Sequence, residues 1–539
     1  MDSVILKGIT RFFLALNAYY EFSNSRKFII GFTDLIKQSF FLRPVYELLT
    51  TYPKKDYVKT SIVMTPVRAA AIMAKWAKVL FLSLASFNEN SLNAKIFNRL
   101  CSFFGNTKYV FRLMIIAFIS SLFAPQIGVR ELALLALPAF AVFTYKNIAL
   151  SFSLFVFTMA VVPNDMWSNA FILAAAVFYS AIFVLLYFYD KARLNTRYLS
   201  ASLMLYIGFC VLSFFTGFGG MDSIRVASIL FSAVILGIIT TNIINTTEKL
   251  NTLVFWIFLS MILTSLYGLL QFTTGIAIRA DFVDIMANIG LPGRLYSTMG
   301  NPNNFAKFLT MFLPLCIAYT FNMDGNLKRI GGAVCLGIIF VALALTFSRA
   351  SYLVIAGSVV FYILLTKPRL VPLILLGGLL ALPLLPDVIL MRLSTIGTDS
   401  SSLYRILIWE GVGRTLSNYW ASGIGIGPQA FVMIYRAYAH NMAGAAMHAH
   451  NVFLNVWIEV GIGGFIAIIA YNLSTFRIGM ASFFNTQNQK LKNYQAAGVS
   501  ALVGFIMFSL VEHVWFYPRT MLVYFILMGI IWAAGIPED

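Results

Sequence analysis

The sequence predicts an all-α, polytopic integral membrane protein with about 12–14 transmembrane helices. Its 539 residues are 60% hydrophobic and 15% aromatic, and only 11% are charged. Soluble globular domains are roughly half apolar and a quarter charged, so this composition excludes a water-soluble enzyme and a disordered or fibrous chain. Apolar runs follow one another from Leu113 onward. We interpret these runs as helices, since open strands would leave their backbone groups unpaired in lipid.

Residues 1–112 differ from the rest because they are strongly basic. They contain 16 Lys and Arg against 6 Asp and Glu, which is +10 of the total net charge of +18. Short apolar patches alternate with these basic residues, and none is long enough to span a membrane. The pattern predicts a cytoplasmic region of amphipathic helices that lie on anionic membrane lipids. A small soluble helical domain is the alternative, and no nucleic-acid partner is predicted.

Fourteen apolar segments predict two transmembrane regions, at residues 113–386 and 450–539. The segments lie at 113–126, 131–145, 148–163, 168–189, 200–217, 225–242, 252–274, 304–321, 330–347, 351–366, 370–386, 450–475, 495–512 and 519–536. Between the two regions, residues 387–449 form a large loop with polar and glycine-rich stretches. We expect this loop to lie outside the cytoplasm and to hold short helices on the membrane surface.

The distribution of basic residues orients these segments. With a cytoplasmic N-terminus, 28 of the 39 Lys and Arg residues fall on the cytoplasmic side and ten in outer loops, as the positive-inside rule requires. All ten outer residues are arginines. The planar guanidinium binds phosphate through two hydrogen bonds, so these arginines indicate a phosphate-containing ligand. Better tolerance of arginine at the membrane interface is the alternative interpretation.

Four polar clusters interrupt the apolar sequence, each before a predicted helix and on the predicted outer side. They lie at Gly300–Asn304, Ser348–Ser351, His448–Asn451 and Glu512–Arg519. Helix N-termini bind anions, although Asn, Ser and Pro there are also ordinary capping residues. Arg349 is not a capping residue, and an arginine between apolar runs is costly without a partner. We therefore interpret Arg349 as a functional residue.

Every histidine of the chain lies in the predicted outer part. The four are His440, His448, His450 and His513. A histidine is suited to activate a hydroxyl as a general base near neutral pH. Metal binding is the alternative, but the spacing of His448 and His450 does not suit one face of a helix, and no carboxylate pair accompanies them. No metal or cofactor is predicted.

A polar stripe is expected on the helix that follows His450. Asn451, Asn455 and Glu459 are spaced four residues apart and share one face of that helix. Such a stripe faces the interior of a bundle, and we expect it to form hydrogen bonds between helices. The glycines at 461, 463 and 464 then permit a neighbouring helix to approach closely.

Four sequence pieces run in a fixed order across roughly residues 290–465. They are GRLYSTMGNPNN at Gly293–Asn304, TFSRAS at Thr346–Ser351, YRILIW at Tyr404–Trp409 with GIGIG at Gly423–Gly427, and HNVFLNVWIEVG at His450–Gly461. In this order, on a many-spanning background, the chain resembles the bacterial O-antigen ligase and O-antigen polymerase family. Residues 1–112 have no counterpart in the resemblance.

The resemblance implies a lipid-dependent, GT-C-like glycosyltransferase of the cytoplasmic (inner) membrane, with its active site on the extracytoplasmic face. The implied donor is a glycan on undecaprenyl diphosphate, and the acceptor is a hydroxyl of a glycan, a lipid-linked glycan or a protein. The implied reaction is inverting and metal-independent. Arg349 and Arg405 match the arginines associated with the donor diphosphate, and His450 matches the histidine that activates the acceptor.

We therefore predict that His450 is the catalytic base and that Arg349 and Arg405 hold the diphosphate. The supporting substrate-binding residues are Arg294, Asn301, Asn303, His448, Asn451 and His513. A polymerase of lipid-linked repeat units uses the same donor chemistry and stays an alternative, and a ligase is slightly favoured. A transporter or flippase of lipid-linked saccharides is the alternative from another class, although the sequence shows no internal repeat of the kind common in transporters.

Overall fold

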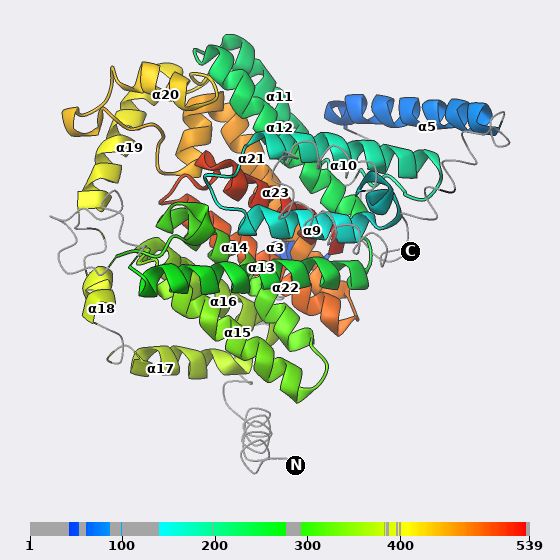
Figure 1. Ribbon diagram of the computed structural model, residues 1–539. Coiled ribbons are helices and arrows are strands. Elements are labelled where there is room, and N and C mark those ends of the chain that lie inside the picture. Colours follow the sequence, from blue (N-terminus) through cyan, green and yellow to red (C-terminus); the bar gives the residue numbers. More distant parts are fainter. Residues whose placement is uncertain are drawn as a thin grey trace, which may run out of the picture.

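The fold is a bundle of helices, which confirms the all-α prediction (Figure 1). The computed structural model describes residues 42–52, 61–86, 140–196, 198–275, 293–381, 387–394 and 400–534, and the single positions 99, 383 and 397. Its α-helices are α3 (Leu42–Thr50), α5 (Thr65–Ser86), α9 (Ile148–Val161), α10 (Ala170–Phe188), α11 (Ala201–Thr216), α12 (Gly220–Ile243), α13 (Thr247–Thr273), α14 (Pro302–Asn322), α15 (Asn326–Ala344), α16 (Arg349–Thr366), α17 (Val371–Ala381), α18 (Asp387–Ser394), α19 (Ser400–Tyr419), α20 (Pro428–Tyr435), α21 (Val452–Asn485), α22 (Gln489–Ser509) and α23 (Pro518–Ala534). Short 3-10 helices are η1 (Ile62–Met64), η3 (Ser297–Met299), η4 (Pro368–Leu370), η6 (Asn441–Ala443) and η7 (Val514–Phe516).

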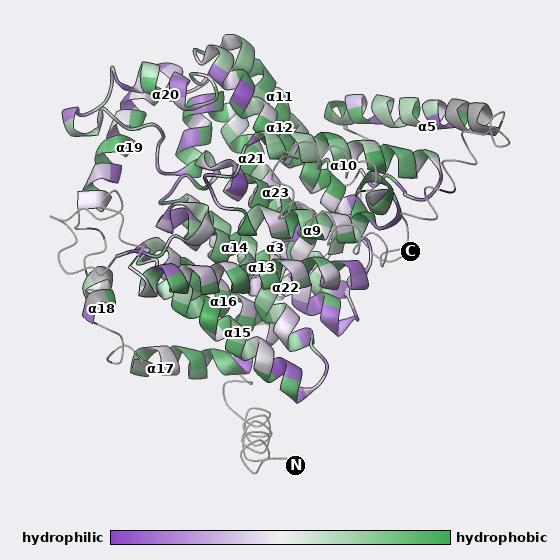
Figure 2. Ribbon diagram, viewed as in Figure 1, coloured by the Kyte–Doolittle hydropathy of each residue, from purple (hydrophilic) through white to green (hydrophobic). Residues whose placement is uncertain are grey.

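The helices are those of a multi-pass membrane protein. Seven of the described helices are long and apolar enough to cross a bilayer: α10, α12, α13, α14, α15, α16 and α21. Hydrophobic residues predominate along the bundle helices (Figure 2). Of the fourteen predicted segments, 113–126 lies outside the described residues and 131–145 is described only from residue 140. Each of the other twelve overlaps a helix, although the ends of 370–386 and 519–536 lie partly outside the described residues.

Two helices occupy the interior of the bundle, and their composition explains this position. α14 packs against α22 and α13, and α23 packs against α12 and α22. Nearly every side chain of both helices is buried. A helix that is apolar on all sides can be covered by other helices on every side. Polar residues at the N-terminal end of α14 are therefore held inside the protein.

The loop between the two predicted transmembrane regions is folded. Its described residues form the short helices α18, α20 and η6 and the longer α19 of 20 residues, and a position outside the cytoplasm stays a prediction. The segment has its own small hydrophobic core, in which Ile408, Phe431 and Tyr435 pack against Ile458 of α21. This packing fixes the loop against the start of α21.

Only part of the basic N-terminal region is described. α3 contacts α21, where Arg477 Nε donates to the carbonyl of Leu48 at 2.9 Å. α5 lies beside α10 at the edge of the molecule (Figure 1). It exposes the large apolar side chains of Met73 and Trp76. A helix lying on a membrane surface stays the prediction for α5, and the other residues of this region lie outside the described part.

Glycines let an extended segment insert between α11 and α21. The amide of Ile424 donates to the carbonyl of Ile458 at 2.8 Å, and that of Ile462 donates to Trp420 at 2.9 Å. α21 is interrupted at Gly461, where φ is 79°. A Cβ atom at Gly461 would lie 2.1 Å from the carbonyl oxygen of Ala421. The close approach expected at this glycine is made by the loop after α19 rather than by a neighbouring helix, and the glycine also forms a kink.

We expect Gly461→Ala to destabilise the protein by roughly 1–3 kcal/mol or more, because alanine is strained at positive φ and its Cβ would overlap the Ala421 carbonyl. The measurement is thermal unfolding of the purified protein in detergent. Gly208→Ala is the matched control, since Gly208 lies in α11 with no atom within 4 Å of its Cβ position. Equal unfolding temperatures for Gly461→Ala and the parent protein would contradict the role of this kink.

Candidate functional site

A buried carboxylate, that of Glu512, is surrounded by basic side chains. His450 Nδ1 lies 3.0 Å from Glu512 Oε1, and Lys307 Nζ lies 3.9 Å from the same oxygen. Arg405 Nη2 donates to Oε2 at 3.4 Å. The side chains of Glu512 and Lys307 are only 7% and 2% exposed. Buried charges are costly unless they are paired, so these groups stabilise one another.

The charge of Glu512 determines which nitrogen of His450 carries a proton. Burial alone would raise the pKa of Glu512, but Lys307, His450 and Arg405 together hold this pKa well below its usual value. Glu512 is therefore an ionised carboxylate that only accepts hydrogen bonds. His450 Nδ1 must then be the donor, which leaves Nε2 of the neutral ring as a proton acceptor.

The backbone holds His450 in a conformation that is rare for this residue type. Its φ is +46°, in the left-handed region. On one side, Asn451 caps α21 by accepting from the amide of Leu454 at 3.0 Å, and it donates to the carbonyl of Leu510 at 2.9 Å. On the other side, Trp409 Nε1 donates to the carbonyl of Ala449 at 2.9 Å. The start of α21 is thus joined to both α19 and the end of α22.

A second group of polar residues joins the segments before α14 and α16. Arg294 Nε donates to the carbonyl of Thr346 at 2.9 Å, and its Nη2 donates to Asn303 Oδ1 at 2.7 Å. Asn301 is the N-cap of α14, and its side chain accepts from the amides at 303 and 304. Arg349 is the first residue of α16, only three positions after Thr346. The structure therefore brings together two of the family-like sequence segments, Gly293–Asn304 and Thr346–Ser351.

α14 connects the two groups. Asn303 and Lys307 are four residues apart and lie on the same side of its first turns. Asn303 contacts Arg294, whereas Lys307 reaches Glu512. The four predicted polar clusters therefore lie at one end of the bundle, next to the N-termini of α14, α16, α21 and α23.

Sequence analysis missed the roles of Lys307 and Glu512. A lysine inside an apolar run was a signal, since such a residue needs a partner in the interior. Glu512 is 205 positions away from Lys307 along the chain. Only the packing of α14 against α22 shows that the two residues meet.

His448 and His513 lie beside His450. The ring centroid of His448 is 4.2 Å from that of His450 and 5.4 Å from that of His513. Burial, reinforced by nearby positive groups, lowers the pKa of His448 to about 2 and that of His513 to about 3. Both rings are therefore neutral at physiological pH.

Three of these residues could in principle hold a metal ion. The ligand atoms of His448, His450 and Glu512 lie within 4.8 Å of one another. The spacing argument against a metal assumed that both histidines lie on a helix. That assumption is wrong, because α21 begins only at Val452. Lys307 and Arg405 nevertheless pair with the same carboxylate, and they would repel a divalent cation. A site without metal stays our prediction.

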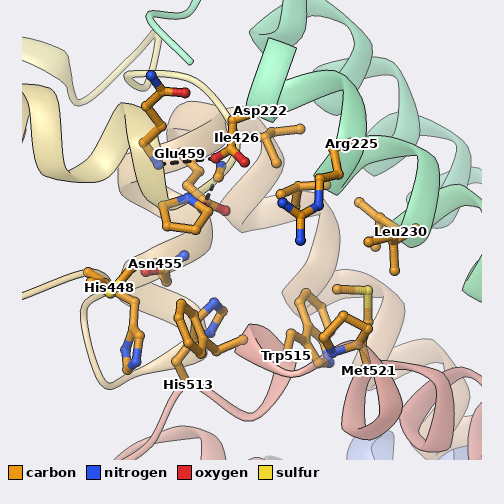
Figure 3. Close-up of a pocket in the computed structure, with 18 of the residues that line it drawn as sticks. Asp222, Arg225, Leu230, Ile426, His448, Asn455, Glu459, His513, Trp515 and Met521 are labelled. Carbon is orange, nitrogen blue, oxygen red and sulfur yellow. Dashed lines mark hydrogen bonds between the residues drawn. The ribbon is translucent and has the colours of Figure 1, made fainter. Parts of the chain in front are cut away.

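A cavity of about 770 Å³ adjoins the histidines (Figure 3). His448 and His513 line it at one end, and Asp222 and Arg225 of α12 line it at another. Most of the remaining wall is apolar, including Trp515 and Met521.

The polar stripe of α21 also faces this cavity, through Asn455 and Glu459. Glu459 Oε1 accepts the amide of Gly427 at 3.0 Å, and Asn455 Oδ1 accepts that of Ala449 at 3.0 Å. Asn455 and Glu459 thus face inward, as expected, and their hydrogen bonds go to the backbone of the loop that precedes α21, whereas Asn451 binds the end of α22.

Comparison with known families supports the resemblance found in the sequence. Residues 334–469 match the family model described as O-Antigen ligase. The matched stretch contains Arg349, Arg405, His448 and His450, whereas Arg294, Lys307, Glu512 and His513 lie outside it. A comparison with curated proteins found no match.

We expect the protein to lose stability as the pH falls below about 6.5. In the unfolded chain His448 and His513 take up protons, whereas in the folded protein their lowered pKa values keep them neutral. Unfolding is therefore favoured by acid, by about 2 kcal/mol for each residue between pH 7 and pH 5. The measurement is the unfolding temperature across this range for the parent protein and for His513→Asn, which should show a shallower dependence. His440→Asn, at an exposed position, is the control, and an unchanged slope in His513→Asn would contradict the expectation.

Proposed function

We propose that this protein, in which residues 334–469 match the O-antigen ligase family model, transfers a glycan from undecaprenyl diphosphate to an acceptor hydroxyl. The proposed place of the reaction is the outer face of the cytoplasmic membrane. One observation carries the proposal: His450 is paired with a buried carboxylate that also binds an arginine and a lysine. This combination offers a base and two cationic side chains in one site.

In the proposed reaction, His450 acts as the general base. Glu512 accepts the Nδ1 proton and orients the ring, so that Nε2 is available to take the proton of the acceptor hydroxyl. The hydroxyl oxygen then attacks the anomeric carbon, and the bond from this carbon to the diphosphate oxygen breaks. The electron pair leaves with the lipid diphosphate. A single displacement of this kind inverts the anomeric centre.

Arg349 and Arg405 are assigned to the diphosphate. Negative charge grows on this leaving group as the bond breaks, and preorganised cationic donors stabilise it. Arg405 is suited to the role because its Nε is buried and has no hydrogen-bond partner among the described residues. Three further residues would support these two arginines by holding the start of α14 against the segment that precedes Arg349. They are Arg294, Asn301 and Asn303.

The remaining predicted residues are assigned to supporting roles. Asn451 would hold His450 in place, since both ends of its side-chain amide bind backbone groups. His448 and His513 would position the acceptor from the cavity side. A polymerase that lengthens lipid-linked repeat units uses the same donor chemistry and is the second candidate. A transporter or flippase gives no reason for an ionised carboxylate that orients a histidine.

We expect His450→Ala to lower the transfer rate by about 10²–10⁴-fold, the typical contribution of a general base. The protein should stay folded, because Glu512 keeps Lys307 and Arg405 as partners. Purified protein would be assayed with an undecaprenyl-diphosphate glycan and a hydroxyl acceptor. Full activity in His450→Ala would refute the base assignment.

For the arginines assigned to the diphosphate, we expect Arg405→Lys to lower the transfer rate by about 10²-fold or more. Lysine keeps the positive charge but loses the planar guanidinium that can form two parallel hydrogen bonds. The readout is the transfer rate in the same assay. Arg414→Lys is the matched control on the same helix, where Arg414 is half-exposed and pairs only loosely with Glu410 at 3.9 Å. Equal losses in the two variants, or no loss in either, would contradict the role of Arg405.

We expect chelators to leave the transfer rate unchanged, because Lys307 and Arg405 already neutralise the carboxylate that a metal ion would need. The check is activity after dialysis against EDTA, with and without added Mg²⁺, Mn²⁺ or Zn²⁺. Loss of activity that one of these ions restores would overturn the metal-free mechanism.

A further inference from the structure

The cavity beside the histidines is separate from the residues assigned to the donor. Its walls come from α12, α20, the start of α21 and the segment from His513 to Met521 (Figure 3). Arg294, Arg349 and Arg405 do not line it. It meets the proposed base through His448, whose ring centroid is 4.2 Å from that of His450. A transferase needs a second substrate next to its base, and this cavity is large enough for a small saccharide or part of a larger glycan.

Two buried polar atoms in the cavity wall lack partners. The Nε1 atom of Trp515 and the Nδ1 atom of His513 form no hydrogen bond within the described part of the chain. Trp515 is 5% exposed and His513 7%. Buried polar groups almost always have a hydrogen-bond partner. Both side chains line the cavity, so a ligand that carries hydroxyl groups would satisfy them.

One cationic side chain in the cavity wall is available to a ligand. Asp222 Oδ2 accepts the amide of Gln429 at 3.2 Å, and Glu459 Oε1 accepts that of Gly427. Both carboxylates are thus directed at backbone amides near the start of α20. Arg225 points into the cavity (Figure 3), and the described residues offer its guanidinium no hydrogen bond or ion pair. Of the charged side chains in the cavity wall, Arg225 is therefore the one that the described residues leave without a partner, and an anionic group of a ligand would pair with it.

We propose that this cavity is the acceptor subsite and that it binds a saccharide bearing a phosphate or a carboxylate, with Arg225 as the residue that selects for the anionic group. The inference rests on the proposed function, since it assigns the second substrate of the same reaction. Arg225 pairs with the anion through its planar fork. Trp515 and His513 bind sugar hydroxyls, and His448 holds the reacting end of the acceptor next to His450. The apolar part of the wall packs against the faces of the sugar rings.

Binding to the full-length protein in nanodiscs tests this inference without turnover. Saturation-transfer NMR would compare glucose 6-phosphate, glucuronate and glucose, and octyl phosphate would represent a lipid phosphate without a sugar. We expect at least one of the two anionic sugars to bind at least tenfold more tightly than glucose and octyl phosphate. The stronger of the two identifies phosphate or carboxylate as the anion.

Variants of Arg225 identify the residue responsible. Arg225→Ala should weaken binding of the anionic sugar roughly ten- to hundredfold, as expected for a lost charge-assisted pair, and Arg225→Lys should weaken it less. Binding should be unchanged in Arg414→Ala, the exposed control. Equal binding of glucose, preferential binding of octyl phosphate, or unchanged binding in Arg225→Ala would each overturn the inference. Failure of the His450 experiment would instead overturn the proposed function and leave this binding result unaffected.

Discussion

The ion cluster around Glu512 is the interaction on which the arrangement of the site depends. One buried carboxylate joins Lys307 of α14, Arg405 of α19 and His450 at the start of α21, three segments far apart in the sequence. Removing one partner from a buried ion pair typically costs about 3–5 kcal/mol, so these helices are held in a fixed relation. The same carboxylate sets the tautomer of His450. The ion pairs of Glu512 therefore both hold the helices together at this end of the bundle and determine which nitrogen of His450 can accept a proton.

Close backbone contacts place the cavity next to this cluster. Glycines at 423, 425 and 461 allow the segment before α20 to lie directly against the kink of α21. This contact brings the amide of Gly427 to Glu459 and so forms one wall of the cavity. Arg405, which we propose to bind the donor, shares Glu512 with His450, whereas His448 and His513 line the cavity. Such an arrangement suits a reaction in which a lipid-borne donor and a polar acceptor meet at one base.

The sequence predicted the helices and the polar clusters because both depend on local features. Apolar runs located the described transmembrane helices, and Asn301 and Asn451 are helix caps, as their residue type suggested. The pairing of Lys307 with Glu512 was not predictable, because it requires the packing of helices distant in sequence. The geometry of His448 and His450 was mispredicted for a local reason: α21 begins after them, so helical spacing does not apply. Arg225 was one of the ten outer arginines, but the sequence could not distinguish it from the other nine, because only the cavity shows that its guanidinium has no partner among the described residues.

The central claim is that Arg349 and His450 face one extracytoplasmic site. Arg349→Cys and His450→Cys, made one at a time in a cysteine-free background, would be labelled in intact cells with a membrane-impermeant maleimide. Gln489→Cys, at the predicted cytoplasmic end of α22, is the control that should react only after the membrane is permeabilised. Labelling of both site positions in intact cells is the expected result. Labelling of one position from outside and of the other only after permeabilisation would place them on opposite sides of the bilayer and contradict the account.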